Sequence, residues 1–119
     1  MLVEDEQEQR EALSMLLEME GYDVLTAESA ERALEMLKDA HPDMIVTDVK
    51  LPGRDGFSLY DLVRENKGIE PIPFLFITGY SDAASIARVK KLGALDYITK
   101  PYNLESLMQK VREHLPPGG

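Results

Sequence analysis

The sequence predicts a single α/β domain in which helices cover both faces of a parallel sheet. Short apolar runs alternate with longer helical patterns, five of each, along 119 residues. Such alternation is typical of strands joined by crossover helices. Several of the apolar runs are rich in β-branched and aromatic residues with little polar alternation, which favours strands buried on both faces. The length suits one domain and contains no internal repeat.

The five strands are expected at the apolar runs. The third and fourth runs show the least polar alternation, so they fit strands with a helix layer on each side. The runs cover residues 1–3, 22–26, 44–47, 74–78 and 96–99.

The first two helices are predicted from apolar residues at helical spacing and from residues typical of helix ends. The first covers about residues 6–20 and stops at Gly21, a C-terminal cap. The second begins after Ser29 as its N-cap. Their apolar faces are Leu13, Leu16 and Leu17 in the first, and Ala33, Leu34 and Leu37 in the second.

The remaining three helices follow the same logic. The fourth begins after Asp82 and ends at Gly93, and the fifth begins after Asn103. We expect the domain to span residues 1–115, with residues 116–119, Pro-Pro-Gly-Gly, as a tail or the start of a linker. The apolar residues are Phe57, Tyr60 and Val63 in the third helix; Ile86 and Val89 in the fourth; and Leu104, Leu107, Met108, Val111 and Leu115 in the fifth.

The composition excludes several functions. Aspartate and glutamate number 22 against 13 lysines and arginines, a net charge of −9, which disfavours binding to nucleic acid or to an anionic membrane. The chain has no cysteine, and its two histidines, His41 and His114, are far apart, which argues against a zinc site. No apolar run is long enough to span a membrane, and the acidic start is no signal peptide. We expect a cytoplasmic location.

Polar residues stand where four of the predicted strands end. The first strand leads into Glu4 and Asp5, the third ends in Asp48, the fourth in Thr78 and the fifth in Lys100. Ligands of parallel sheets bind outside the carboxyl ends of the strands. If the sheet order brings these strands together, three carboxylates converge beside a hydroxyl and an ammonium group.

Such a cluster of carboxylates needs a cation. Two carboxylates about 4 Å apart repel by about 4 kcal/mol at an effective dielectric constant near 20. Hard oxygen ligands with an open side favour Mg²⁺. A divalent ion together with Lys100 would leave surplus positive charge for a phosphoryl group, which Asp48 is positioned to accept as an acyl phosphate.

Each of these residues also has an ordinary structural interpretation. Asp48 suits a turn, Glu4 and Asp5 suit the N-terminus of a helix, Thr78 suits a turn, and a lone lysine is usually a solvated charge. The joint pattern favours function, because the polar residues fall at strand ends in the order that a metal and phosphate site requires.

Four motifs, in order and at these spacings, resemble one family. They are the acidic pair Glu4-Asp5, the stretch DVKLPGRDG at 48–56, ITG at 77–79 and GALDYITKP at 93–101. Over nearly its whole length the chain resembles the receiver domain of bacterial two-component response regulators. The resemblance implies a flavodoxin-like, doubly wound sheet of five parallel strands in the order 2-1-3-4-5, with five helices on its two faces.

The resemblance also implies a chemistry. Asp48 would take a phosphoryl group from a phosphohistidine on a sensor histidine kinase. Mg²⁺, for which Mn²⁺ would substitute, would be bound directly by Asp5, Asp48 and the backbone carbonyl of Lys50, with Glu4 helping through water. In the family the first acid is more often aspartate than glutamate, and the first strand usually begins a few residues earlier.

The same resemblance implies a switch. Thr78 and Lys100 would contact the phosphoryl oxygens, and Tyr97 would turn inward when Thr78 moves. The Lys100-Pro101 bond would be cis. After Thr78 and Tyr97 move, the face made by the fourth helix, fifth strand and fifth helix would change its preference for an output domain or a partner protein. Members of the family often form homodimers, so a homodimer is one expected outcome. Such a domain is a regulator that catalyses only its own phosphotransfer and dephosphorylation.

Three alternatives remain at this point. A Mg²⁺-dependent aspartyl phosphotransferase acting on a separate substrate would need a cap or substrate pocket, for which the chain has no spare residues. A flavin or nucleotide binder would need a phosphate-cradling loop where Glu4 and Asp5 stand. A degenerate receiver would serve as an interaction module that does not depend on phosphorylation.

Overall fold

The five strands form one parallel sheet in the order β2-β1-β3-β4-β5, as the resemblance implies. A computed structural model describes residues 1–66, 72–79 and 82–115, so the tail expected at 116–119 lies outside the described residues. The strands are β1 (Leu2–Val3), β2 (Thr26–Ala27), β3 (Ile45–Asp48), β4 (Phe74–Gly79) and β5 (Asp96–Lys100). The helices are α1 (Gln7–Met19), α2 (Ala30–Met36), α3 (Gly56–Glu65), α4 (Ala83–Leu92) and α5 (Leu104–His114).

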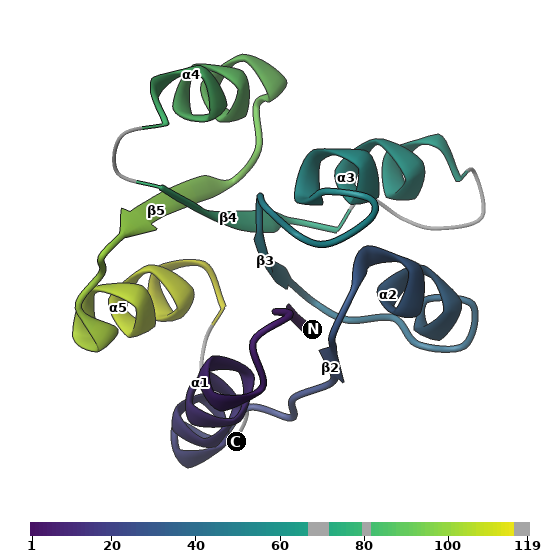
Figure 1. The fold of residues 1–119 in the computed structure, drawn as a ribbon. Coiled ribbons are helices and arrows are strands. Elements are labelled where there is room, and N and C mark those ends of the chain that lie inside the picture. Colours follow the sequence, from purple (N-terminus) through teal and green to yellow (C-terminus); the bar gives the residue numbers. More distant parts are fainter. Residues whose placement is uncertain (67–71, 80–81, 116–119) are drawn as a thin grey trace.

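Helices cover both faces of the sheet, so the predicted doubly wound arrangement is confirmed. Helices α1 and α5 lie on one face, and α2, α3 and α4 lie on the other (Figure 1). The buried side chains accordingly form two clusters. One joins α1 and α5 to the sheet through residues such as Leu13 and Leu107, and the other joins α2, α3 and α4 to it through residues such as Ala33, Phe57 and Val89.

The predicted helix ends are largely confirmed. The side chains of Ser29, Asp82 and Asn103 each accept a hydrogen bond from a backbone N–H in the first turn of the helix that follows. Helix α4 ends at Gly93, whose positive φ of 71° suits a residue without a side chain. These local signals fix where each helix starts and therefore which loops border the carboxyl edge of the sheet.

The second strand was predicted at the wrong residues. The prediction placed it at 22–26, whereas β2 contains only Thr26 and Ala27. These two residues pair with Leu2 and Val3 of β1, and the backbone oxygen of Leu25 accepts a hydrogen bond from the Leu2 N–H at 2.8 Å. The apolar residues just before β2 pack instead: Tyr22 and Val24 lie against the cluster formed with α1 and α5.

Two apolar patterns also bury less than predicted. Helix α3 buries five residues, including the expected Phe57, Tyr60 and Val63, whereas α4 buries only Val89. Leu104 is 47% exposed because it is the first residue of α5 and stands at the edge of the helix layer. Of the other residues expected on the apolar faces of α1 and α5, Leu16 and Leu115 are partly buried and the rest are buried. Among the three helices on its face of the sheet, α2, α3 and α4, helix α4 therefore buries the fewest side chains.

Candidate functional site

The carboxyl ends of the strands bring the predicted site residues together. Strands β1, β3, β4 and β5 are consecutive neighbours in the sheet. In the β4–β5 register, Thr78 pairs with Thr99 and Gly79 pairs with Lys100. Asp48, the last residue of β3, pairs with Ile77, the residue before Thr78. The residues predicted from four separate segments thus share one edge of the sheet.

Asp48 and Lys100 form an ion pair at this edge. The Nζ atom of Lys100 lies 3.1 Å from Oδ1 and 3.2 Å from Oδ2 of Asp48. The Asp48 residue is 4% exposed. Burial alone would lower the pKa of Lys100, but the hydrogen bond and the negative charges of Asp48 and Glu4 outweigh it and raise that pKa. The lysine therefore stays charged.

Glu4 is a buried acid to which no described residue donates a hydrogen bond. The residue is 2% exposed, and within the described part of the chain neither of its carboxylate oxygens has a hydrogen-bond partner. Burial is the main cause that raises its pKa to about 8; the charge of the nearby Asp48, and a hydrogen bond that Glu4 would donate to Asp48 once protonated, add to the effect. An unpaired charge in such a position is costly unless a cation or a proton neutralises it.

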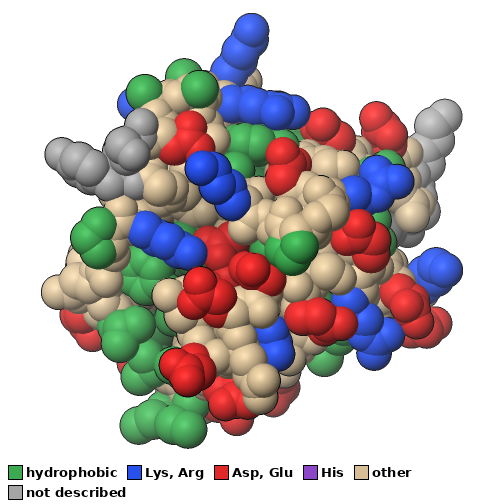
Figure 2. Space-filling model, viewed as in Figure 1, with side chains coloured by type: hydrophobic (Ala, Val, Ile, Leu, Met, Phe, Trp, Pro, Cys, Tyr) green, Lys and Arg blue, Asp and Glu red, His purple; other side chains and the backbone are tan. Residues whose placement is uncertain are grey.

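The three predicted acids are close enough to share one ion. Glu4, Asp5 and Asp48 each offer a carboxylate oxygen, and these oxygens lie within 4.8 Å of one another. Asp5 is exposed, which leaves the cluster an open side. Figure 2 shows acidic side chains gathered in the middle of this face, with lysine and arginine side chains beside them. The donor set and the unpartnered oxygens of Glu4 fit a hard divalent cation such as Mg²⁺.

Thr78 stands beside the cluster with a free hydroxyl group. The residue is 2% exposed, and no partner for its Oγ1 atom exists among residues 1–66, 72–79 and 82–115. A buried hydroxyl without a partner is uncommon in folded proteins. The hydroxyl is therefore available to donate to a group that enters the pocket.

The loop after β3 holds Asp48 by close backbone contact. A Cβ atom at Gly56 would lie 2.4 Å from the backbone oxygen of Asp48, and the Gly56 N–H donates to the oxygen of Val49 at 2.8 Å. Thr47 donates through its hydroxyl to the same Asp48 oxygen at 3.0 Å. The sequence predicted turn chemistry at Asp55-Gly56 but not this close approach, because it depends on how the loop folds back onto β3.

The other two predicted residues, Lys50 and Tyr97, are not among the acids that cluster with Asp48. Lys50 is exposed in the loop after β3. Tyr97 lies in β5, opposite Phe76 of β4, and its half-buried ring packs against the cluster under α3 and α4. The Lys100-Pro101 peptide bond is cis, as the resemblance implies.

A hollow of about 520 Å³ adjoins the site on the α1 side. It is lined by Gln9, Ala12, Leu13, Lys100, Pro101, Tyr102 and Leu104. The exposed Leu104 belongs to this hollow, so an apolar surface borders the residue that contacts Asp48.

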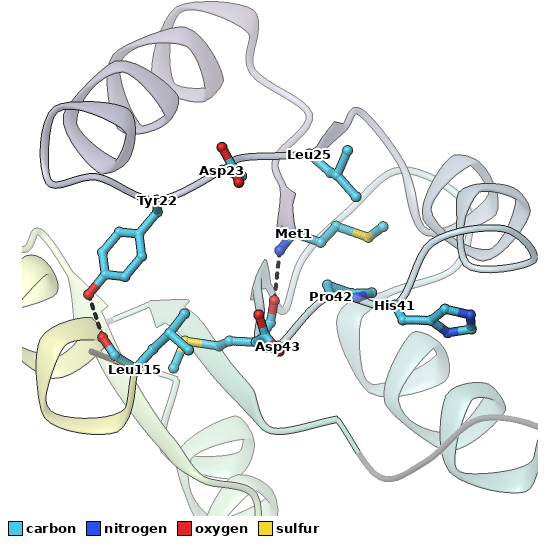
Figure 3. Close-up of a pocket in the computed structure, with 9 residues that line it drawn as sticks. Met1, Tyr22, Asp23, Leu25, His41, Pro42, Asp43 and Leu115 are labelled. Atoms are coloured by element: carbon cyan, nitrogen blue, oxygen red, sulfur yellow. Dashed lines mark hydrogen bonds between the residues drawn. The ribbon is translucent and has the colours of Figure 1, made fainter. Parts of the chain in front are cut away.

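A second cavity, of about 390 Å³, lies at the opposite edge of the sheet. Figure 3 shows Met1 donating from its amino group to the backbone oxygen of Met44, and Tyr22 donating to that of Leu115. Met1 and Met44 directly precede β1 and β3, so this cavity faces the amino ends of the strands. It is therefore remote from Asp48.

Within the described ranges, no helix has both the length and the apolar character needed to cross a membrane.

Known proteins are similar to this chain in sequence and in fold. The chain is 35% identical to the transcriptional regulatory protein AfsQ1 of Streptomyces coelicolor over 99% of its length, but covers 51% of that protein. With YvrH of Bacillus subtilis it shares 38% identity over 97% of its length and 48% of that protein. It thus spans about half the length of these curated relatives.

Solved structures of a response regulator and of a receiver domain have the same fold as this chain. Chemotaxis response regulator CheY4 of Vibrio cholerae superimposes with a TM-score of 0.85 at 30% identity, covering 96% of this chain and 95% of that one. The receiver domain of HemR from Leptospira biflexa gives 0.86, also at 30% identity, over 97% of this chain and 91% of that one. The family model of the response regulator receiver domain matches residues 1–112. The chain therefore belongs to the response regulator receiver domain family of two-component signalling.

Proposed function

We propose that the domain is a switch operated by phosphorylation of Asp48. The observation that carries this proposal is the ion pair between the buried Asp48 and Lys100, beside the carboxylates of Glu4 and Asp5. No other carboxylate among the described residues has both the burial of Asp48 and a cation on both of its oxygens. Glu4, Asp5 and the backbone carbonyl of Lys50 would hold Mg²⁺, or Mn²⁺, with Asp48. The ion supplies charge neutralisation for the transferring group.

The phosphoryl group would come from a phosphohistidine of a sensor histidine kinase. An oxygen of Asp48 forms the new bond to phosphorus as the bond from phosphorus to the imidazole nitrogen breaks, and the imidazole leaves with that electron pair. Lys100 then moves from the carboxylate to a phosphoryl oxygen, and the Thr78 hydroxyl donates to another. Hydrolysis by water returns the carboxylate, so the domain acts on itself and not on a separate substrate.

The new contacts are strong enough to shift a conformational balance. The hydrogen bond from Thr78 is new, whereas Lys100 exchanges its contact with the Asp48 carboxylate for one with the phosphoryl group. A hydrogen bond to a charged group contributes about 1.5–3 kcal/mol, and every change of about 1.4 kcal/mol alters an equilibrium constant about tenfold. We infer that Thr78 draws the end of β4 toward the phosphoryl group, that Tyr97 packs inward, and that the α4–β5–α5 face changes its preference for an output domain or partner.

The hollow beside Lys100 suits the docking of the kinase. Its lining combines α1 residues with Pro101, Tyr102 and the exposed Leu104. A helix that presents a phosphohistidine would place its apolar residues there and its phosphoryl group near Asp48. Docking at this position would leave the α4 side of the molecule free for the output.

The test is intact mass after incubation with Mg²⁺ and acetyl phosphate. We expect the mass of one phosphoryl group to be added to the wild-type chain, and neither to Asp48→Asn nor to the wild type with a chelator. Thr78→Val is the matched variant for the switch, because it should still be phosphorylated but respond less. A folded, Mg²⁺-binding wild type that gains no phosphoryl group would contradict the proposal and favour a degenerate interaction module.

A further inference from the structure

Helix α4 is held to the rest of the molecule by few core contacts. Among its residues only Val89 is buried, whereas the neighbouring α3 buries five residues. Its last turn carries Lys90 and Lys91, and Lys90 and Arg88 are exposed. A helix with one buried side chain depends on contacts at its sides to stay in one position.

Three side-chain contacts, two of them made by Arg88, tie α4 to α3. The guanidinium carbon of Arg88 lies 4.4 Å from the centre of the Phe57 ring, and Nη2 of the same arginine lies 3.8 Å from Oδ2 of Asp61. Further along, the Tyr60 hydroxyl donates to the backbone oxygen of Leu92 at 3.4 Å. Phe57, Tyr60 and Asp61 are all residues of α3, so α3 holds α4 at its middle and at its end.

The aromatic ring under Arg88 belongs to a packed cluster that reaches the site. The centres of the Phe57 and Phe76 rings are 5.2 Å apart. Phe76 is fully buried in β4, two residues before Thr78, and pairs with Tyr97 of β5. The contact of Arg88 with Phe57 therefore couples α4 to the strand whose end carries Thr78.

We propose that Arg88 is a clamp that holds α4 against α3 in the unphosphorylated protein and so sets the resting balance of the switch. The clamp rests on the proposed function, since it acts on the switch that phosphorylation of Asp48 would operate. The planar guanidinium group stacks on the Phe57 ring while pairing with Asp61, and the compact ammonium group of a lysine does not reproduce this double contact. A displacement of α4 away from α3 would break both contacts together.

The magnitude of the clamp suits an adjustable switch. A cation–π contact at a partly exposed position changes an equilibrium by about two- to fivefold. The Arg88–Asp61 pair, with side chains 51% and 49% exposed, adds less because solvent screens it. Losing the clamp would therefore raise the population of the displaced state severalfold without unfolding the domain.

The test compares Arg88→Met with Arg32→Met. Methionine keeps an unbranched apolar stem but loses the charge and the planar group. Arg32 is the matched control, because it pairs with Glu35 at 3.1 Å within one helix, α2, and is similarly exposed. Two readouts are measured on the full chain: hydrogen exchange of the α4 amides without ligand, and the affinity for beryllium fluoride with Mg²⁺, a stand-in for the phosphoryl group.

In Arg88→Met we expect faster exchange in α4 and an affinity for beryllium fluoride higher by about two- to fivefold, because a larger share of the chains already occupies the responsive state. Arg32→Met should match the wild type in both, and Arg88→Lys should fall between. Unchanged α4 exchange, or an affinity that stays equal or falls, would overturn the clamp.

The experiment distinguishes failure of the proposed function from failure of the Arg88 clamp. Binding of beryllium fluoride by the wild type tests the proposed function, and the difference between wild type and Arg88→Met tests the clamp. If the wild type does not bind it, the proposed function fails, and α4 exchange alone then decides whether Arg88 holds the helix. A denaturant titration of each variant shows whether faster exchange comes from α4 or from global unfolding.

Discussion

The two sides of the site are built differently. We define the acceptor side as β1, β3 and α3, and the responding side as the end of β4 with α4 and β5. All four residues of β3 are buried, whereas in β5 only Ile98 is buried. Helices α3 and α4 have 10 residues each, yet α3 buries five of them and α4 one. On the acceptor side all of β3 and half of α3 are therefore buried, whereas β5 and α4 on the responding side each bury a single residue.

This difference separates reaction geometry from response. In the proposed switch, Asp48 and Glu4 would have to keep their positions to hold a metal and a phosphoryl group, and burial restricts both residues. Helix α4 and Tyr97 would have to move at low cost, and their shallow packing suits that role. A receiver with both sides equally packed would hold its acceptor well but would resist the movement that carries the signal.

The largest expected difference in stability is between substitutions in α3 and in α4. Phe57→Ala should destabilise the domain by about 3–5 kcal/mol, because it empties a buried ring site next to Phe76. Ile86→Ala, at a half-exposed position of α4, should cost under about 1 kcal/mol. Urea unfolding of both variants measures the difference, and similar losses would show that α4 is as much a part of the core as α3.

The next effect concerns the buried acid of the acceptor side. Because the pKa of Glu4 is raised to about 8 in the folded protein from its usual 4.5, folding retains a proton that the unfolded chain releases. The free energy of unfolding of the metal-free protein should therefore fall as pH rises between these values, by at most about 1.4 kcal/mol per pH unit. Glu4→Gln should remove this dependence.

Urea midpoints of the wild type and of Glu4→Gln between pH 5 and pH 8 check that expectation. Glu8→Gln is the control, because it removes an exposed acid of α1. Saturating Mg²⁺ at pH 8 should restore the stability of the wild type more than that of Glu4→Gln. Equal slopes for both proteins would mean that Glu4 ionises as a solvated acid.

Alanine substitutions at Gly56, on the acceptor side, and at Gly79, on the responding side, should differ in their cost to stability. Gly56→Ala should cost about 1–3 kcal/mol and slow phosphorylation, because its Cβ would lie 2.4 Å from the Asp48 oxygen and push against backbone. At Gly79, on the responding side, the atom of the described residues that a Cβ would meet is the Cβ of Asp82, at 3.8 Å, which is an ordinary contact. Thermal unfolding and the rate of mass gain with acetyl phosphate compare them, and a Gly56→Ala chain that reacts at the wild-type rate would contradict the steric argument.

The smallest effect lies in β5. Burial would raise the pKa of Asp96, but hydrogen bonds from Lys110 at 2.9 Å and from the Tyr97 N–H at 2.8 Å outweigh it and lower that pKa below 3.8. This stabilisation is present above pH 4 and is lost as pH falls through the lowered value. Asp96→Asn should therefore cost about 1 kcal/mol or less at pH 7, and the difference should vanish in strong acid. A cost that persists at low pH would exclude the ionised carboxylate as its cause.

Much of the fold could be predicted because it depends on local patterns. The alternation of strands and helices, the caps at Ser29 and Asn103 and the convergence of Asp48 with Lys100 all follow from short stretches of sequence and from the geometry of parallel sheets. Strand 22–26 was wrong because strand length at an edge depends on the partner strand, and β1 offers only two residues. No local pattern carries that information.

Other features depended on distances between segments. The apolar pattern of α4 predicted a face containing Ile86 and Val89, but how deeply a helix packs is decided by its neighbours. The contact of Arg88 with Phe57 and the approach of Gly56 to Asp48 are of the same kind, because each joins residues whose relative positions the chain sets only when folded. The burial of Glu4 follows from the same cause.

The shallow packing of α4 also bears on how such domains diversify. All but one of its residues lie outside the core, so substitutions there cost little stability and survive selection for folding. Substitutions at the five buried positions of α3 are expected to cost more stability. If the proposed switch is right, a receiver of this kind can change the surface that α4 offers to a partner without disturbing the buried surroundings of Asp48.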